Sequence, residues 1–447
     1  MKAMTVSRTI CLGFLVFISV GTLLLLLPWA NANGSWGNPL VALFTATSAV
    51  CVTGLIVVDT GSHFSPLGQG IILMLIQVGG LGYMTANSFL MLLLGRRLKL
   101  KDRLAIQQSM DNSELAGGSS LIVSIITMTL IFELTGIFCL YPTFQQEFGG
   151  GRGLWLSIFH SISAFNNAGF SLFSDSIVGY ALNPWVNLVI TGLVIVGGIG
   201  YQVIMELYLW ARHQFRGDQR RTTFSLNFKI VTSTTVALLA IGTVAFLLIE
   251  FNNPATLGDY TPHQKLLMAW FQSVIARTAG FNSIDIGAMG EASLFIMIAL
   301  MFVGASPGST GGGIKTTTLR ILLACTRMVL QGKEDVLSYR RQIPPSRVLK
   351  AIAVVMGSGL AVLTATTLVS ISNPSLNFID VLFESVSAFA TVGLSTGITA
   401  NLSDVGKYVI IITMYLGRVG ILLFMAALLG DPKPTALQYP EEDLLIG

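Results

Sequence analysis

The segment Phe383-Glu384-Ser385-Val386-Ser387-Ala388-Phe389-Ala390-Thr391-Val392-Gly393-Leu394 is one of four copies of a pattern that decides the fold. Each copy starts with Phe, continues through about ten residues rich in Ser, Thr, Ala and Val, and ends with Gly and a large apolar residue. A long apolar segment precedes and follows every copy. Four copies of helix, glycine loop and helix predict a pore with pseudo-fourfold symmetry. The copies are Phe44–Leu55, Phe159–Phe170, Phe271–Phe281 and Phe383–Leu394, with glycines 115, 111 and 113 residues apart.

The composition indicates a membrane protein. Of the 447 residues, 53% are hydrophobic and only 11% are charged, and the mean hydropathy is +0.72. A soluble domain carries about 25% charged residues, so we expect an integral membrane protein. The repeat favours one membrane domain over residues 1–430, followed by a short cytoplasmic tail at 431–447. The four repeats are predicted at roughly 9–95, 119–211, 228–327 and 347–430.

Each repeat contains two apolar segments long enough to cross about 30 Å of hydrocarbon. The stretch between them is too short to span, so we expect it to enter the membrane as a re-entrant helix beside water or protein. The predicted fold class is an all-α membrane protein with eight spanning helices and four re-entrant pore helices around a pseudo-fourfold pore. The first helices are expected near 9–29, 120–142, 229–251 and 348–371, and the second helices near 68–94, 185–210, 292–327 and 406–429.

Basic residues cluster at 96–103, 212–221 and 333–350, in the segments that join the repeats. Loops rich in Lys and Arg stay on the cytoplasmic side of a membrane. We therefore expect a multi-pass protein of the cell membrane whose termini are both cytoplasmic. The same clusters can contact anionic membrane lipid or a partner protein, and nothing in their placement favours nucleic acid.

The repeated glycines predict a selectivity filter for a cation. A ring of inward carbonyl oxygens needs backbone angles that most residues avoid and that Gly adopts without penalty. The short helix before each Gly also directs its partly negative C-terminal end at the pore. The Thr-Val-Gly of the fourth copy is closest to the Thr-Val-Gly-Tyr-Gly filter of potassium channels. The predicted filter residues are Val52, Thr53, Gly54, Asn167, Ala168, Gly169, Thr278, Ala279, Gly280, Thr391, Val392 and Gly393.

The second helix of the third repeat contains a glycine-rich break. One Pro and five Gly within ten residues cannot hold a regular helix, and the break lies at mid-membrane, where it must border water or protein. A flexible loop that gates the pore is the favoured interpretation, and a plain kink is the alternative. A phosphate-binding loop is disfavoured because no strand precedes it. The predicted gate residues in this break are Gly304, Ser306, Pro307, Gly308, Ser309, Thr310, Gly311, Gly312, Gly313 and Lys315.

Arg418 lies at the matching depth of the fourth repeat and is also assigned to the gate. An Arg inside a membrane helix is costly and marks a functional site by default. We expect its guanidinium to bond carbonyls of the glycine-rich break and to repel cations below the filter. The alternative is an Arg that extends to the membrane surface. The aligned glycines of the first two repeats, at 79–82 and 197–200, are interpreted as sites of close helix packing.

The chain resembles the Trk/Ktr/HKT superfamily, and within it the KtrB-type subunits, over residues 10–430. The resemblance rests on the four glycine loops, the break at 304–313 and Arg418. It implies potassium as the substrate ion, bound at Gly54, Gly169, Gly280 and Gly393, and sodium as an activator or coupling ion. It also implies a homodimer and a cytosolic KtrA-like nucleotide-binding ring. No covalently bound cofactor is expected.

Two classes of transport function stay open. One is a channel-like potassium translocator, and the other is a secondary transporter of sodium, or of sodium and potassium. Four repeats that run in the same direction favour the pore, because alternating access usually goes with inverted halves. An enzyme is not expected, since the four His residues are far apart and lack metal-ligand spacing. His160 is interpreted as a polar contact within its pore helix.

Overall fold

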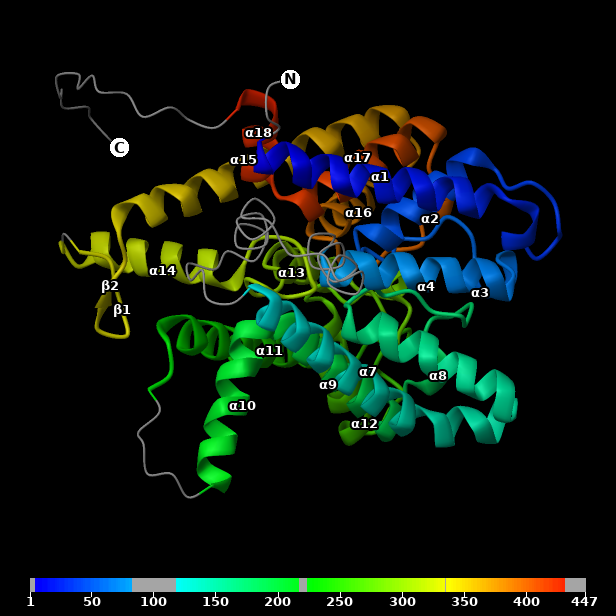
Figure 1. The fold of residues 1–447 in the computed structure, drawn as a ribbon, viewed down its shortest axis with the longest axis horizontal. Helices are drawn as coiled ribbons and strands as arrows, with labels where there is room; N and C mark the ends of the chain where they lie inside the picture. Colours follow the sequence, from blue (N-terminus) through cyan, green and yellow to red (C-terminus); the bar gives the residue numbers. More distant parts are fainter. Residues whose placement is uncertain (1–4, 83–117, 217–222, 334, 431–447) are drawn as a thin grey trace.

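The computed structural model describes residues 5–82, 118–216, 223–333 and 335–430, which are mostly helical (Figure 1). The first helix of each repeat is long and apolar enough to cross a membrane. Even the shortest, of 21 residues, is about 32 Å long at 1.5 Å per residue. Helix α7 continues past its predicted end near 142, although Pro142 lies inside it. The four are α1 (Val6–Leu26), α7 (Gly118–Phe148), α11 (Leu226–Ile249) and α15 (Pro345–Ser372).

A short pore helix follows each first helix, as predicted. The longest of the four has 16 residues, about 24 Å, and does not reach across the hydrocarbon layer. Local signals set their starts: Asn38 caps the first, and Thr261 and Gln264 form a reciprocal capping box at the third. The Phe that opens each sequence repeat is fully buried in its pore helix. These helices are α2 (Pro39–Val50), α8 (Gly150–Phe165), α12 (Pro262–Ile275) and α16 (Phe378–Ala390).

The second helices depart from the prediction of continuous spans. Helix α9 turns by 103° into α10 at Gly200, and α17 turns by 94° into α18 at Gly420. The φ angles of these glycines are 94° and 86°, values that no α-helix contains. The predicted second helices at 185–210 and 406–429 are therefore present, but each is broken by a sharp bend. In the first repeat α4 (Pro66–Leu81) ends at Gly82, and residues 83–94 lie outside the described part. The other bounds are α9 (Pro184–Ile199), α10 (Tyr201–Phe215), α17 (Asp404–Val419) and α18 (Ile421–Leu429).

The third repeat shows the expected break. Helix α13 (Glu291–Phe302) ends where the glycine-rich segment begins, and α14 (Thr316–Leu330) starts after it. Residues 303–315, the intramembrane loop, form no helix between them. Its two ends meet in a parallel bridge between Val303 and Ile314. The loop therefore leaves α13 and returns to nearly the same point.

The aligned glycines pack second helices against pore helices, as interpreted from the sequence. A Cβ on Gly79 would lie 2.2 Å from the Val50 carbonyl oxygen, and one on Gly197 would lie 1.9 Å from that of Phe165. Gly417 repeats the contact with Phe389 at 1.8 Å. Such separations are far below van der Waals contact, so only Gly allows this approach.

Contacts between repeats close the bundle into a ring. Helix α4 packs on pore helix α8, α9 on α12, α13 on α16, and α17 on α2. Each second helix therefore covers the pore helix of the next repeat, and the fourth repeat returns to the first. The pseudo-fourfold arrangement places the four loops that follow the pore helices at its centre.

The remaining elements lie toward the two ends of the bundle. Figure 1 shows α10, α14 and a hairpin of β1 (Leu337–Ser338) and β2 (Arg341–Gln342) at one end, and α3 (Thr60–His63) at the other. In the hairpin, Leu337 pairs with Gln342 and Ser338 with Arg341. The described residues also contain the 3-10 turns η1 (Pro28–Ala30), η2 (Val178–Tyr180), η3 (Ile286–Ala288) and η4 (Thr399–Asn401).

Candidate ion pathway

All four pore helices end with the same backbone course. The residue two positions before each repeated Gly has a left-handed φ: 56° at Val52, 57° at Asn167, 71° at Thr278 and 51° at Thr391. The next N–H bonds back to the pore helix, for example from Thr53 to the Ser48 carbonyl at 2.8 Å. The glycines follow with φ values of 93°, 69°, 72° and 91° in chain order. Since three of the four left-handed residues are not Asn or Gly, the surrounding structure imposes this strained turn.

The four glycines form a closed ring, here called the glycine ring: Gly54, Gly169, Gly280 and Gly393. A Cβ on any of them would collide with the carbonyl oxygen of the residue before the next glycine. The Cβ-to-oxygen distances would be 2.4 Å from Gly54 to Ala168, 2.8 Å from Gly169 to Ala279, 2.6 Å from Gly280 to Val392, and 2.1 Å from Gly393 to Thr53. Segments more than a hundred residues apart in the chain thus meet with their backbones in contact.

The glycine ring is buried, and the threonines beside it contribute hydroxyl oxygens without a hydrogen-bond partner. Thr53, Thr278 and Thr391 have no exposed surface. Among the described residues, the hydroxyls of Thr53 and Thr391 have no hydrogen-bond partner. A buried polar oxygen without a partner is rare in proteins. Together with the backbone carbonyls and the C-terminal ends of four helices, these oxygens make a site suited to a cation stripped of water.

An outer cavity of about 220 Å³ opens directly onto the ring. All four ring glycines line it, together with serines and threonines that follow them in the second and fourth repeats. Asp175 contributes a carboxylate to its wall. This cavity is polar and sits on the side of the ring away from the intramembrane loop.

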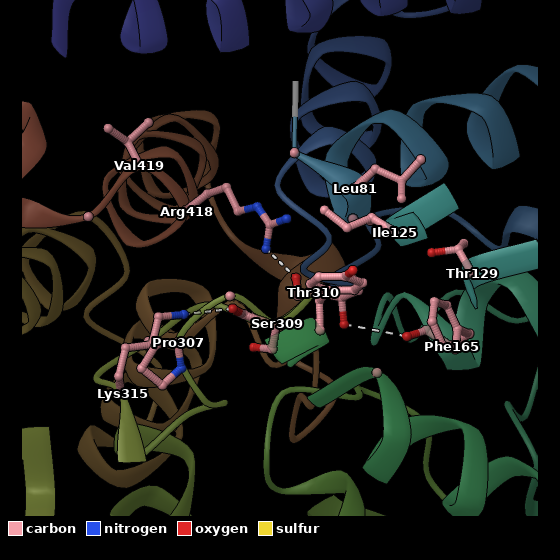
Figure 2. A pocket seen from close by; sticks show the side chains of 18 of the residues that line it. Leu81, Ile125, Thr129, Phe165, Pro307, Ser309, Thr310, Lys315, Arg418 and Val419 are labelled. Atoms are coloured by element: carbon pink, nitrogen blue, oxygen red, sulfur yellow. Dashed lines mark hydrogen bonds between the residues drawn. The ribbon is translucent and has the colours of Figure 1, made fainter. Parts of the chain in front are cut away.

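An inner cavity of about 300 Å³ lies on the other side and is shown in Figure 2. Its wall includes Gly82 at the end of α4, Tyr201 at the bend between α9 and α10, Gly420 at the bend between α17 and α18, and most of the intramembrane loop. Pro307 and Ser309 line it, as does the side chain of Arg418. The breaks in the second helices therefore form the boundary of this cavity.

The intramembrane loop is bonded to the break in the second repeat. The Ser306 N–H donates to the Gly198 carbonyl at 3.0 Å, and the Thr310 N–H to that of Gly197 at 3.3 Å. In return the Tyr201 N–H donates to the Gly308 carbonyl at 3.1 Å. The break thereby recovers hydrogen bonds that a continuous helix would have made internally.

The loop also presses against the underside of the ring. A Cβ on Gly311 would lie 2.2 Å from the Thr278 hydroxyl oxygen, and one on Gly312 would lie 2.3 Å from that of Thr391. The Thr310 hydroxyl lies 3.3 Å from the Asn167 side-chain amide. The predicted filter and gate residues are thus in direct contact, with no room between them for any side chain on these glycines.

Cationic side chains from the loop itself and from the fourth repeat bond to carbonyls of the loop. Arg418 donates hydrogen bonds to the carbonyls of Thr310 and Gly79, so the contact expected between Arg418 and the break is present (Figure 2). Lys315 donates from Nζ to the Gly311 carbonyl at 2.8 Å. The guanidinium therefore joins the first, third and fourth repeats below the ring.

Comparison with known proteins identifies the family. The family model for TrkH, described as a cation transport protein, matches residues 3–429. The chain belongs to this family of cation transport proteins. It is 40% identical to Ktr system potassium uptake protein B of Vibrio alginolyticus, over 98% of this chain and 94% of that protein. It is 35% identical to the potassium/sodium uptake protein NtpJ of Enterococcus hirae, over 100% and 98%. The crystal structure of the potassium transporter TrkH from Vibrio parahaemolyticus shares the fold, with a TM-score of 0.75, 17% identity, and coverage of 97% and 86%.

The sequence analysis missed several buried charged side chains, and three of them contact elements that surround the ion pathway. Glu133 of α7 accepts hydrogen bonds from Gln77 at 3.2 Å and Asn166 at 3.0 Å. Arg277, just before the third filter segment, lies 3.5 Å from the Gly304 carbonyl at the start of the loop. Glu384 of α16 accepts a hydrogen bond from Thr399. Each is a charged residue in an apolar segment, which is the signal that could have found it.

His160 is a polar contact, as interpreted from the sequence. Its Nδ1 lies 2.8 Å from the Leu156 carbonyl oxygen and its Nε2 lies 3.0 Å from the Ser171 hydroxyl. Both ring nitrogens are therefore engaged within the second repeat. Its neighbour Ser171 lines the outer cavity.

Proposed function

We propose that this chain takes up potassium ions across the cell membrane through the glycine ring. The observation that carries the proposal is the closure of four backbone segments into one ring with a cavity on each side. Carbonyl oxygens in such a ring can replace the water around a monovalent cation. The names of the relatives support potassium as the ion. In this proposal the ion binds at Gly54, Gly169, Gly280 and Gly393.

We infer further that the intramembrane loop is the gate. Gly311 and Gly312 lie against the hydroxyls of the filter threonines, where an ion leaving the ring would emerge. Arg418 and Lys315 hold the loop by its carbonyls and add positive charge to this region. Release of those bonds would let the glycine-rich backbone swing into the inner cavity. Glycines give the loop the freedom to adopt a second course.

The role of sodium is a separate part of the proposal. The NtpJ relative is named a potassium/sodium uptake protein, which supports a role for sodium as an activator, a coupling ion or a second substrate. The alternative function is a secondary transporter of sodium or of both ions. Each second helix makes the same contact with the pore helix of the next repeat all the way around the ring. This arrangement favours four repeats that run in one direction, and hence a pore, over two inverted halves.

The proposal also includes assembly with other subunits. The relative from Vibrio alginolyticus is named protein B of a Ktr system, which supports assembly with further subunits. In this proposal the chain forms a homodimer that docks a cytosolic nucleotide-binding ring of KtrA type. Exposed basic residues lie at the end of α10 and in the β1–β2 hairpin, including Arg216 and Arg340. These residues offer docking charge on the expected cytoplasmic face, and anionic lipid would bind the same charge.

The test is rubidium and potassium uptake in a bacterium that lacks its own potassium uptake systems. Cells that express the chain, alone or with a candidate ring, are expected to grow at low potassium and to accumulate rubidium. Sodium is then added or withheld to measure its effect on the uptake rate. An abundant membrane-inserted protein with no rubidium uptake under any of these conditions would refute the proposal.

A further inference from the structure

One polar position recurs on all four pore helices, immediately after the buried Phe. It is occupied by Thr45, His160, Gln272 and Glu384. All four side chains are buried, with at most 2% of their surface exposed. A polar side chain in such a place needs a partner. The partners reveal what the position does.

In the second and third repeats the partner is a serine shortly after the ring glycine. The His160 Nε2 lies 3.0 Å from the Ser171 hydroxyl, and the Gln272 Nε2 donates to the Ser283 hydroxyl at 3.3 Å. A side chain at this position therefore links the pore helix to the outer end of the filter segment by a hydrogen bond. We call this position, occupied by Thr45, His160, Gln272 and Glu384, the strut. In the first repeat the residue matching Ser171 is Ile56, which has no side-chain hydroxyl for such a bond.

The fourth repeat places a carboxyl group at this strut. Glu384 accepts a hydrogen bond from the Thr399 hydroxyl, whose oxygen lies 3.0 Å from the Ser395 hydroxyl oxygen. Both hydroxyl-bearing residues line the outer cavity, next to Gly393 of the glycine ring. Glu384 itself has no exposed surface, and its second carboxyl oxygen has no partner among the described residues. No Lys or Arg is paired with it in that part of the chain.

We propose that Glu384, Ser395 and Thr399 form a cation subsite at the outer end of the glycine ring. A hydroxyl that donates its proton to a carboxylate turns its oxygen lone pairs away from that carboxylate. The oxygen is also polarised, because hydrogen bonds in a chain strengthen one another in a medium of low dielectric constant. The Thr399 hydroxyl, and through it the Ser395 hydroxyl 3.0 Å away, thus relay the negative charge of Glu384 to the cavity. The ligand is a monovalent cation that is losing its water before it enters the ring.

The inference rests on the proposed function and adds a specific role for one charge. If Glu384 were only a strut, a neutral residue of the same shape would serve equally well, as Gln272 does in the third repeat. If its charge recruits the ion, loss of the charge weakens binding while the structure persists. The chain offers a direct way to separate these roles, because Gln272 also has a buried side-chain oxygen without a partner in the described part.

The experiment measures rubidium uptake against external concentration for Glu384→Gln, Gln272→Glu and the double variant that carries both changes. Asp380→Asn is the control, since that carboxylate lies one turn earlier on α16 and outside the cavity lining. Membrane abundance is measured for each. We expect Glu384→Gln to raise KM about tenfold, the scale of losing one unit charge near an ion inside a protein. Vmax should stay within about twofold. The double variant should recover at least half of the loss on a logarithmic scale, because the charge has moved to the equivalent strut.

An unchanged KM in Glu384→Gln would overturn the inference while leaving the proposed function intact, since the variant would still transport. A raised KM that the double variant does not recover would assign Glu384 a structural role only and would also overturn it. If Glu384→Gln fails to reach the membrane, Gln272→Glu alone decides: a lower KM supports the charge effect, and an unchanged KM refutes it. Absence of uptake by the wild-type protein would instead refute the proposed function.

Discussion

Replacement of each ring glycine by Ser is expected to weaken the preference for potassium over sodium by amounts that the structure ranks. A Cβ would lie 2.1 Å from the facing carbonyl oxygen at Gly393, 2.4 Å at Gly54, 2.6 Å at Gly280 and 2.8 Å at Gly169. Comfortable contact is about 3.5 Å. The facing carbonyl must therefore move by about 1.4 Å for Gly393→Ser but only about 0.7 Å for Gly169→Ser. Because strain energy rises roughly with the square of a distortion, doubling the displacement costs about four times as much.

Backbone angles separate the same two pairs of glycines. Gly393 and Gly54 have φ near 91° and 93°, outside the small left-handed region open to other residues, whereas Gly280 and Gly169 at 72° and 69° lie close to its edge. A left-handed residue with a side chain costs about 1–2 kcal/mol even within that region, and 1.4 kcal/mol is a factor of ten. We expect a loss of preference of about tenfold for Gly169→Ser, rising to more than a hundredfold for Gly393→Ser.

The assay is rubidium uptake in competition with potassium and with sodium, normalised to membrane abundance. Gly359→Ser is the matched control, because a Cβ at Gly359 of α15 would meet no atom within 4 Å. It should leave the preference unchanged. Equal losses at all four ring positions, or the largest loss at Gly169, would refute the steric reasoning. Unchanged preference in all four would remove these glycines from the ion pathway.

Three further results are expected. Arg418→Gln should raise potassium flux at least tenfold, because it removes a charged hydrogen bond to the loop carbonyl of Thr310, worth about 1.5–3 kcal/mol, and the bond to Gly79 that anchors the guanidinium; a flat or lower flux would contradict the gate. Shortening the segment 308–313 should also raise flux, and unchanged flux with normal abundance would count against a steric block. Gly417→Ala should lower the thermal midpoint of the detergent-solubilised protein by several degrees, since its Cβ would lie 1.8 Å from the Phe389 carbonyl oxygen, whereas Gly192→Ala, with open space around it, should not.

The repeats and the ring could be predicted because they depend on residues with few physical alternatives. A Gly at the same place in four apolar stretches indicates a backbone that other residues avoid, and the structure gives all four a positive φ. The contact of Arg418 could be anticipated for a similar reason. A guanidinium inside a membrane needs acceptors, and a broken helix supplies free carbonyls.

The bends at Gly200 and Gly420 could not be predicted, because the local sequence is also compatible with a continuous apolar helix. A tertiary contact stabilises the break in the second helix of the second repeat. The Gly308 carbonyl of the third repeat accepts a hydrogen bond from the Tyr201 N–H, which offsets the lost helical hydrogen bond. The left-handed turns at Val52 and Thr391 were hidden for the same reason. Residues with side chains adopt that conformation only where the surrounding contacts impose it.

The intramembrane loop is best understood as an enlarged form of a break that other repeats make with one glycine. Gly198 and Arg418 occupy the same place, two residues before the bends at Gly200 and Gly420, and Ala305 of the loop aligns with them. A Cβ on Gly198 would lie 3.3 Å from the Asn167 side chain, so little room is available there. In the fourth repeat the same place carries a long cation that reaches Thr310 instead. The inner cavity is therefore asymmetric although the ring above it is nearly symmetric. Ion selection can rest on features that all four repeats share, whereas gating requires the third and fourth repeats to differ from the others.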